Sequence, residues 1–215
     1  MNFLEKYNIK INNKNLLQTA LTHSSYANEN NTESYERLEY LGDAVLQVII
    51  SQYLYKNTQL NEGEMSKERA KYVCEEALCQ YVKDVGYDKL ISVGNGLVNN
   101  INDNIIADTF EAVLAVIYLE CGLEECQRYI NKVVIPYIES SHDFFIDYKT
   151  KLQEMIQTDK KSLEYVLVDS FGEAHNMTFK VNVVVDGIVL GTGIAHSKKA
   201  AEQKAAQDAL NKGAK

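Results

Sequence analysis

Residues 36–46 read ERLEYLGDAVL and place three carboxylates, Glu36, Glu39 and Asp43, inside a strongly apolar segment. Apolar residues continue past this stretch at spacings of three and four, which predicts a helix over about 34–56. At about 100° per residue, the three acids fall on one face of that helix. Because a buried carboxylate without a partner is costly, such a helix needs something that neutralises its acids.

A second apolar segment, ADTFEAVLA, carries Asp108 and Glu111 three residues apart, again on one helical face. Five carboxylates on two apolar helices are explained if a cation holds them together. All the ligands are oxygens, which suits Mg²⁺ or Mn²⁺. Such an ion can supply an attacking water and stabilise the leaving oxygen of a phosphodiester. The pattern therefore favours metal-dependent phosphodiester hydrolysis.

Two other interpretations of the acids remain open at this point. A di-iron carboxylate bundle would need Glu-x-x-His pairs, and neither acidic helix has one. A solvated acidic face would be the simpler explanation of a single Glu-x-x-Glu pattern. Here acids interrupt strongly apolar helices twice, which favours a metal site.

The cysteines form two pairs, each five residues apart, a spacing that turns their side chains by about 140° on a helix. The short Cys-x-x-Cys spacing of zinc sites is missing. We therefore expect reduced core thiols rather than a metal-thiolate site. The residues concerned are Cys74, Cys79, Cys121 and Cys126.

Targeting signals are not evident in the sequence. The N-terminal stretch MNFLEKYNIKINNKN lacks an apolar signal core, and no apolar run approaches the ~20 residues that span a bilayer. We therefore expect a cytoplasmic protein.

Charge is distributed unevenly along the 215 residues, whose formal net charge is −8. Residues 1–147 hold 12 Lys and Arg against 22 Asp and Glu, whereas residues 148–215 hold 10 against 8. This asymmetry indicates two domains with different roles. We expect an all-α domain over 1–140, a linker over 141–147 and a second domain over 148–215.

Helical periodicity extends through the first part, and the pattern changes near residue 148. Helices are expected at about 2–8, 13–20, 34–56, 65–84, 103–121 and 123–138. The second part begins with an amphipathic helix and continues with three alternating strands. Its Asp186–Gly187 pair predicts a two-residue hairpin turn, and Ser197 predicts the N-cap of a final Ala-rich helix. The fold class is thus multidomain, all-α followed by a small α+β (α-β-β-β-α) domain.

These motifs resemble those of the ribonuclease III family. ERLEYLGDAVL with the downstream ADTFEAVLA is similar to the family signature, and LTHSSYANE and EGEMSKERAKYV resemble neighbouring segments. Residues 148–215 resemble a double-stranded-RNA-binding domain. The resemblance implies an endoribonuclease that cleaves double-stranded RNA to 5′-phosphate and 3′-hydroxyl ends. It also implies a homodimer that processes ribosomal RNA precursors and structured messenger RNA.

The resemblance implies roles for the acids. Glu39, Asp43, Asp108 and Glu111 match the metal ligands, and Asp43 and Glu111 match the most critical, catalytic acids. Glu36 and Glu62 match accessory acids near the cleavage site. The implied cofactor is Mg²⁺, for which Mn²⁺ can substitute.

Gly42, His23 and the long acidic helix carry further expectations. Gly42 could allow another helix or RNA backbone to approach closely, or could be a tolerated helix-interior glycine. His23 is interpreted as a hydrogen-bonded structural histidine. The helix 34–56 is a candidate dimer element because its large apolar surface needs a partner.

Three surfaces of the second domain are candidates for duplex RNA, which is read by shape along its minor grooves. The first helix presents a polar face, the loop GEAHNMTF resembles the family's minor-groove loop, and the last helix begins with two lysines at its positive end. The residues are Thr150, Gln153, Glu154, Gln157, His175, Lys198 and Lys199.

Two alternative functions stay open: a non-catalytic duplex-RNA-binding protein with a degenerate nuclease domain, and a helical metalloenzyme acting on small molecules. The four core acids argue against the first, and the RNA-binding module argues against the second.

Overall fold

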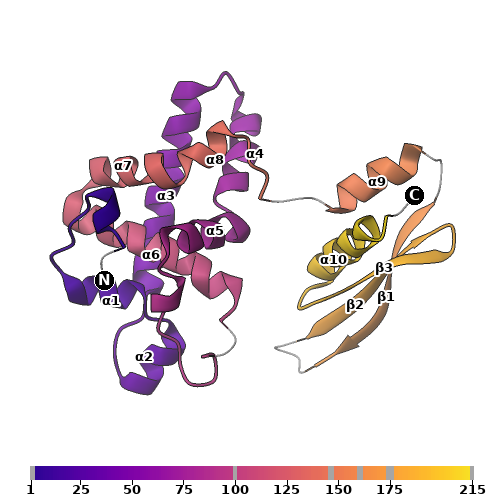
Figure 1. Ribbon diagram of the computed structural model, residues 1–215, viewed down its shortest axis with the longest axis horizontal. Coiled ribbons are helices and arrows are strands. Elements are labelled where there is room, and N and C mark those ends of the chain that lie inside the picture. Colours follow the sequence, from indigo (N-terminus) through magenta and orange to yellow (C-terminus); the bar gives the residue numbers. More distant parts are fainter. Residues whose placement is uncertain (1–2, 99–100, 145–147, 159–161, 173–176, 214–215) are drawn as a thin grey trace. The chain divides into compact units, whose positions relative to one another are not determined.

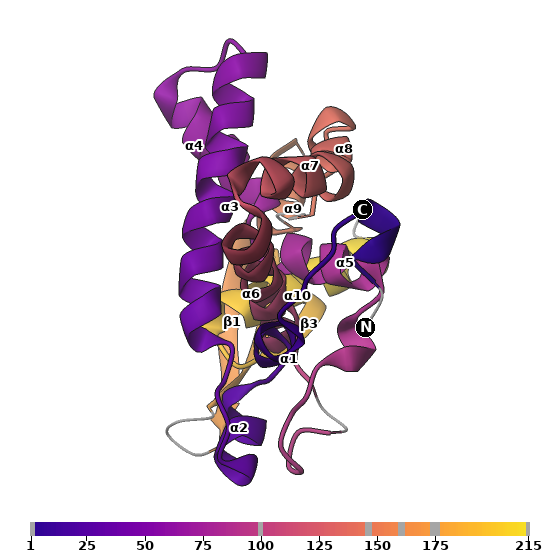
Figure 2. The same cartoon turned by 90° about the vertical axis from the view of Figure 1, so that its left-hand side faces the viewer.

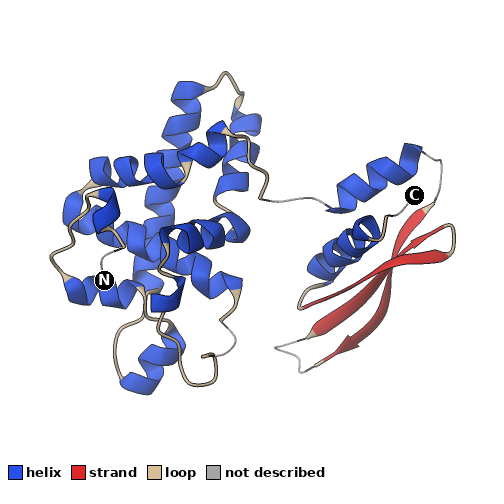
Figure 3. Ribbon diagram, viewed as in Figure 1, coloured by secondary structure: helices blue, strands red, loops and turns tan. Residues whose placement is uncertain are grey.

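The computed structural model describes residues 3–98, 101–144, 148–158, 162–172 and 177–213. The chain divides into two compact units, residues 1–145 and 146–215 (Figure 1). The first is helical, and the second combines a three-stranded sheet with two helices (Figure 3). The predicted fold class is therefore confirmed. The expected linker 141–147 and the exact domain limits stay predictions.

The first unit is built from short helices around one long pair. Its described helices are η1 (Glu5–Tyr7), α1 (Lys14–Ala20), α2 (Ser24–Asn30), α3 (Glu36–Asn57), α4 (Glu62–Tyr72), α5 (Glu75–Val85), η2 (Asp88–Leu90), α6 (Asp103–Cys121), α7 (Leu123–Val133) and α8 (Ile135–Glu139).

Helix α6 is the centre of this unit and packs along α3 (Figure 2). Its residues from Ala112 to Ile117 are all fully buried. A Cβ added to Gly42 of α3 would lie 1.8 Å from the carbonyl oxygen of Glu111 on α6. Only a glycine permits this approach, so the interpretation of Gly42 as a site of close helix contact is confirmed.

Several helix expectations differ from the structure. The described part of the expected helix 2–8 contains only the short 3-10 helix η1. The segment 65–84 is two helices, α4 and α5, because Val73 and Cys74 leave helical backbone angles and Cys74 is extended. Pro136 lies in the first turn of α8, where its missing N–H is tolerated, so the last predicted helix divides into α7 and α8. Helix α2 was not expected, since its sequence SSYANEN has little apolar periodicity.

The second unit contains α9 (Tyr148–Thr158), β1 (Leu163–Phe171), β2 (Thr178–Val185), β3 (Ile188–Ala195) and α10 (Lys198–Asn211). The strands pair antiparallel in the order β1-β2-β3. Asp186 and Gly187 both have positive φ, of 48° and 80°, which confirms the predicted hairpin turn. Ser197 accepts a hydrogen bond from the backbone N–H of Ala200 and is the N-cap, as expected.

The Ala-rich composition of α10 is explained by close packing on the sheet. Ala201, Ala205 and Ala209 are fully buried. Added Cβ atoms at Gly191 and Gly193 of β3 would lie within 2.3 Å of α10 backbone oxygens. Small residues on both sides therefore let the helix approach the strand directly.

The described helices include none that is both long and apolar enough to cross a membrane. Among the cysteines, which are all free, Cys79 and Cys126 are buried as expected of core residues, whereas Cys121 is exposed.

Candidate metal centre

Two acids on each of the two long helices lie around the α3–α6 contact. Glu39 and Asp43 flank Gly42 on α3, and Gly42 touches the backbone of Glu111 on α6. Asp108 lies one turn before Glu111 on the same helix. Helical periodicity puts each pair on one face, and the helix contact brings the two faces together.

Burial and repulsion by neighbouring acids disfavour ionisation of Glu111 and Glu39. Burial raises the pKa of Glu111 to about 8, with further contributions from the charges of Asp43, Glu39 and Asp108. Burial raises the pKa of Glu39 to about 6, and Asp108, Glu36 and Asp43 add to the shift. The pKa values of Glu39 and Glu111 are thus both raised by neighbouring acids, which is typical of a functional cluster.

The Asp108 carboxylate is held by two hydrogen-bond donors. The Tyr35 hydroxyl donates to its Oδ2 over 3.0 Å, and Asn104 Nδ2 donates to the same atom over 3.0 Å. Burial raises the pKa of Asp108, whereas the Tyr35 hydrogen bond and the nearby His23 oppose that rise. Asp43, on the opposite helix, accepts a hydrogen bond from Gln47 Nε2 over 3.1 Å.

The two accessory acids lie in different places. Glu36 is exposed in the first turn of α3, accepts a hydrogen bond from Ser34 Oγ over 3.2 Å, and raises the pKa of Glu39. Glu62 begins α4, which follows the far end of α3. The 14 residues from Asp43 to Asn57 span ~20 Å of helix. The structure therefore brings Glu36 to the cluster within one chain, but does not bring Glu62 there.

Within the described residues, no group of three His, Cys, Asp or Glu side chains could hold a metal ion as it stands. The donor set nevertheless fits a hard divalent cation, because it consists of carboxylates whose repulsion such an ion would relieve. Carboxylate side chains have several staggered rotamers and can change their direction by rotation. The acids are thus suited to a cation by chemistry and by placement on two packed helices.

The candidate RNA-binding residues of the second unit lie mainly on exposed helix surfaces. Thr150, Gln153 and Glu154 are exposed on α9, whereas Leu152 and Ile156 of the same helix are buried. Lys198 and Lys199 are exposed in the first turn of α10, directly after its N-cap. His175 and the side chain of Gln157 lie outside the described residues.

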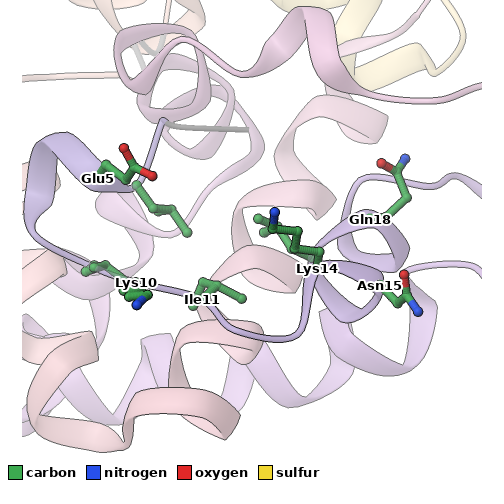
Figure 4. Close-up of a pocket in the computed structure, with 9 residues that line it drawn as sticks. Glu5, Lys10, Ile11, Lys14, Asn15 and Gln18 are labelled. Atoms are coloured by element: carbon green, nitrogen blue, oxygen red, sulfur yellow. The ribbon is translucent and has the colours of Figure 1, made fainter.

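The pocket in Figure 4 lies near the N-terminus and has no role in this cluster. Its lining includes Glu5, Lys10, Ile11, Lys14, Asn15 and Gln18. None of the four core acids lines it.

Sequence comparisons give a family for both units. The family model described as Ribonuclease-III-like matches residues 13–138, and the double-stranded RNA binding motif matches residues 148–212. "Ribonuclease 3" of Streptococcus thermophilus is 43% identical over 224 residues, which cover 98% of this chain and 98% of that protein. The chain belongs to the ribonuclease III family.

Other members of the ribonuclease III family are similarly close. "Ribonuclease 3" of Onion yellows phytoplasma is 42% identical over 212 residues, covering 97% of this chain and 89% of the relative. The solved nuclease domain of ribonuclease III from Campylobacter jejuni is 30% identical with a TM-score of 0.58, and covers 62% of this chain and 94% of that chain. Ribonuclease III proteins generally depend on a divalent metal, in agreement with the acid cluster.

Sequence reasoning did not identify the residues that support this ribonuclease III acid cluster. Asn104 precedes Asp108 by four residues on one helix, a spacing that could have revealed it. Tyr35 meets Asp108 across 73 residues of sequence, and no local pattern predicts that contact. His23 was interpreted as structural, and it does cap α2 by accepting a hydrogen bond from Ser25 N.

Proposed function

We propose that this chain is a divalent-metal-dependent endoribonuclease that hydrolyses double-stranded RNA to 5′-phosphate and 3′-hydroxyl ends. The observation that carries the proposal is the group of four carboxylates at the α3–α6 contact, where Glu111 and Glu39 have raised pKa values. The same chain contains a unit that matches the double-stranded RNA binding motif.

Glu39, Asp43, Asp108 and Glu111 would hold Mg²⁺, for which Mn²⁺ can substitute. When bound, the ion supplies an activated water and charge stabilisation at the phosphate. Asp43 and Glu111 are the catalytic acids of this proposal. Because the carboxyls of Glu39 and Glu111 have raised pKa values, they release protons on metal binding.

Glu36 is proposed as an accessory acid beside the cluster, since its charge already acts on Glu39. Glu62 is proposed as a second accessory acid, acting at some distance from the cluster of its own chain. Its place at the start of α4 leaves it exposed.

The second unit is proposed to grip the duplex through three surfaces. The polar face of α9 with Thr150, Gln153, Glu154 and Gln157 would meet minor-groove hydroxyls, and His175 would enter a further minor groove. Lys198 and Lys199 would contact phosphate, where the exposed first-turn N–H groups of α10 add attraction.

The protein is proposed to act as a homodimer through the outer face of α3. Three large apolar side chains on this helix are exposed: Tyr40 at 84%, Val48 at 55% and Tyr55 at 76%. Exposed apolar groups on one helix are typical of an interaction surface. The related Campylobacter jejuni structure is described as having a region involved in dimer formation.

The proposed substrates are ribosomal RNA precursors and duplex regions of messenger RNA in the cytoplasm. Four free cysteines agree with a reducing compartment.

Incubation of the purified protein with a long RNA duplex, with and without Mg²⁺, tests the proposal. Short fragments with 5′-phosphate and 3′-hydroxyl ends are expected only with Mg²⁺. Retention of intact duplex in both reactions would instead indicate an RNA-binding protein without catalytic activity.

A further inference from the structure

Tyr35 connects the two acid-bearing helices through one hydroxyl. It lies directly before α3 and is only 2% exposed, yet its hydroxyl reaches Asp108 Oδ2 on α6 over 3.0 Å. A buried hydroxyl group normally finds one hydrogen-bond partner, and here that partner is a proposed metal ligand.

Both donors to Asp108 use the same oxygen. The Tyr35 hydroxyl and Asn104 Nδ2 both donate to Oδ2, and within the described residues no hydrogen bond is made to Oδ1. Outer hydrogen bonds of this kind orient ligating side chains in metal sites. We propose that Tyr35 is a positioning residue, whose hydroxyl fixes the Asp108 carboxylate by Oδ2 and leaves Oδ1 for a divalent cation. This inference rests on the proposed function.

The backbone of Tyr35 is fixed firmly enough for this role. Its N–H donates to the Thr22 carbonyl over 2.9 Å, and its carbonyl accepts from Leu38 N and Glu39 N over 2.8 and 2.9 Å. The same residue therefore starts the helix that carries Glu39 and supports the acid on the opposite helix.

The ring of Tyr35 is also supported. It packs against the His23 ring, with 5.8 Å between centroids, and His23 Nδ1 lies 2.8 Å from Ser25 Oγ. Ser25 Oγ in turn accepts a hydrogen bond from Gly94 N over 2.8 Å. His23, Ser25 and the loop at Gly94 thus form a continuous support behind the Tyr35 ring.

The Tyr35 hydroxyl is a reliable donor. A tyrosine hydroxyl has an ordinary pKa of about 10 and therefore carries its proton at neutral pH. Asn104 is a second, independent donor on the exposed side of α6. Removal of either donor should leave the orientation of the Asp108 carboxylate less fixed, while all four carboxylates remain.

The matched variants are Tyr35→Phe and Tyr129→Phe. Each removes one buried tyrosine hydroxyl and keeps the ring, but Tyr129 Oη has no hydrogen-bond partner among the described residues. Asn104→Ala tests the second donor at an exposed helix position, where folding is not at risk. Mn²⁺ binding to each full-length protein is measured without RNA, from the electron paramagnetic resonance signal of free Mn²⁺.

Tyr35→Phe is expected to weaken Mn²⁺ binding about tenfold, the lower limit for removal of such an outer hydrogen bond. Tyr129→Phe is expected to bind Mn²⁺ with the wild-type affinity. The Mn²⁺ affinity of Asn104→Ala is expected to lie between those of Tyr35→Phe and the wild type. In cleavage assays, Tyr35→Phe should need more Mg²⁺ for half-maximal rate, while duplex affinity stays unchanged.

Mn²⁺ binding by Tyr35→Phe within twofold of wild type would overturn the inference and leave the proposed function intact. If Tyr35→Phe fails to fold, unchanged Mn²⁺ binding by Asn104→Ala overturns it instead. A wild-type protein that neither binds Mn²⁺ nor cleaves duplex RNA would contradict the proposed function and the inference with it.

Discussion

Glu111 lies where the backbones of α3 and α6 touch, so its carboxyl loses solvent and meets three other acids. Its pKa of about 8 means that the folded protein without metal holds a proton there near neutral pH. The same position places the carboxyl beside Asp43, Glu39 and Asp108. When all four groups are ionised they repel one another, and a bound cation would offset this repulsion. The burial of Glu111 beside three acids therefore has two expected effects: it lowers the stability of the metal-free protein when the group ionises, and it favours binding of a catalytic metal.

The stability of the metal-free protein should fall as pH rises from about 5 to about 8. In this range the folded state binds more protons than the unfolded state, because the pKa of Glu111 rises from 4.5 to about 8 on folding. Thermal unfolding in a chelator measures the effect, and a drop of about 10 °C is expected from a shift of this size. Glu111→Gln should flatten this dependence, and an equally steep fall in that variant would contradict the assignment.

The sequence was sufficient to predict which residues form the acidic faces, because period and composition are local properties. The faces of Glu39 with Asp43 and of Asp108 with Glu111 follow from spacings of four and three. The contact of Tyr35 with Asp108 could not be predicted, since it depends on how α3 packs on α6. The sequence therefore predicts which helix faces carry acids. Tertiary packing determines which residues, such as Tyr35, form hydrogen bonds to those acids.

Helices α3 and α6 approach one another at Gly42, and this contact sets the separation of their acids. Gly42→Ala should destabilise the first unit by about 1–3 kcal/mol, because the added carbon would lie 1.8 Å from the Glu111 carbonyl oxygen. Displaced carboxylates should also lower the cleavage rate by about 100-fold. Urea unfolding and single-turnover cleavage measure the two effects.

Gly63→Ala is the matched control, since Gly63 is also inside a helix and its added Cβ would meet only Asn61 Oδ1, at 3.6 Å. It should stabilise the protein by up to about 1 kcal/mol through helix propensity. Equal effects of the two substitutions would show that Gly42 has no special packing role.

Helix α10 begins with two exposed lysines, which the proposal places against phosphate. The double variant Lys198→Gln/Lys199→Gln should weaken duplex binding and reduce the slope of log affinity against log salt by about one for each phosphate that is no longer neutralised. Lys204→Gln, at an exposed position further along the same helix, should change that slope less. Filter binding over a salt series distinguishes these results. Identical slopes for the wild type, the double variant and Lys204→Gln would contradict the proposed phosphate binding.

Elements with strong periodicity were mostly predicted well, whereas helix α2, which has little periodicity, was not. The helices α3 and α6 match the expectation within a few residues, and the Asp186–Gly187 turn joins two of the three expected strands. Helix α2 depends instead on its His23 cap and on Glu29, whose carboxylate accepts hydrogen bonds from Asn95 N and Nδ2. Hydrogen bonds between residues 66 positions apart stabilise it, and periodicity carries no signal for them.

The two units differ in charge as well as in fold, with the acids concentrated before residue 148. Acidic ligands in the first unit are balanced by metal in the proposal, and the second unit provides part of the grip on RNA. Dimerisation would cover the exposed apolar side chains of α3. In the proposal, each of these features contributes to holding and cutting one duplex.

Tyr40→Lys should convert the protein to a monomer, because a buried lysine in the dimer interface would lack a partner. Sedimentation velocity measures the change in mass. Leu90→Lys, at an exposed apolar position outside α3, serves as the control and should leave the dimer intact. A wild-type protein that sediments as a monomer at assay concentrations would contradict the proposed homodimer.

The most direct test of the central claim compares Glu111→Gln with Glu124→Gln, which removes the same charge at an exposed position on α7. Both variants are assayed for duplex RNA cleavage at saturating Mg²⁺ and for duplex binding on filters. Glu111→Gln is expected to bind duplex RNA as the wild type does and to lose cleavage by several orders of magnitude, while Glu124→Gln cleaves normally. Cleavage by Glu111→Gln at the wild-type rate would contradict the assignment of the acid cluster as the catalytic metal centre.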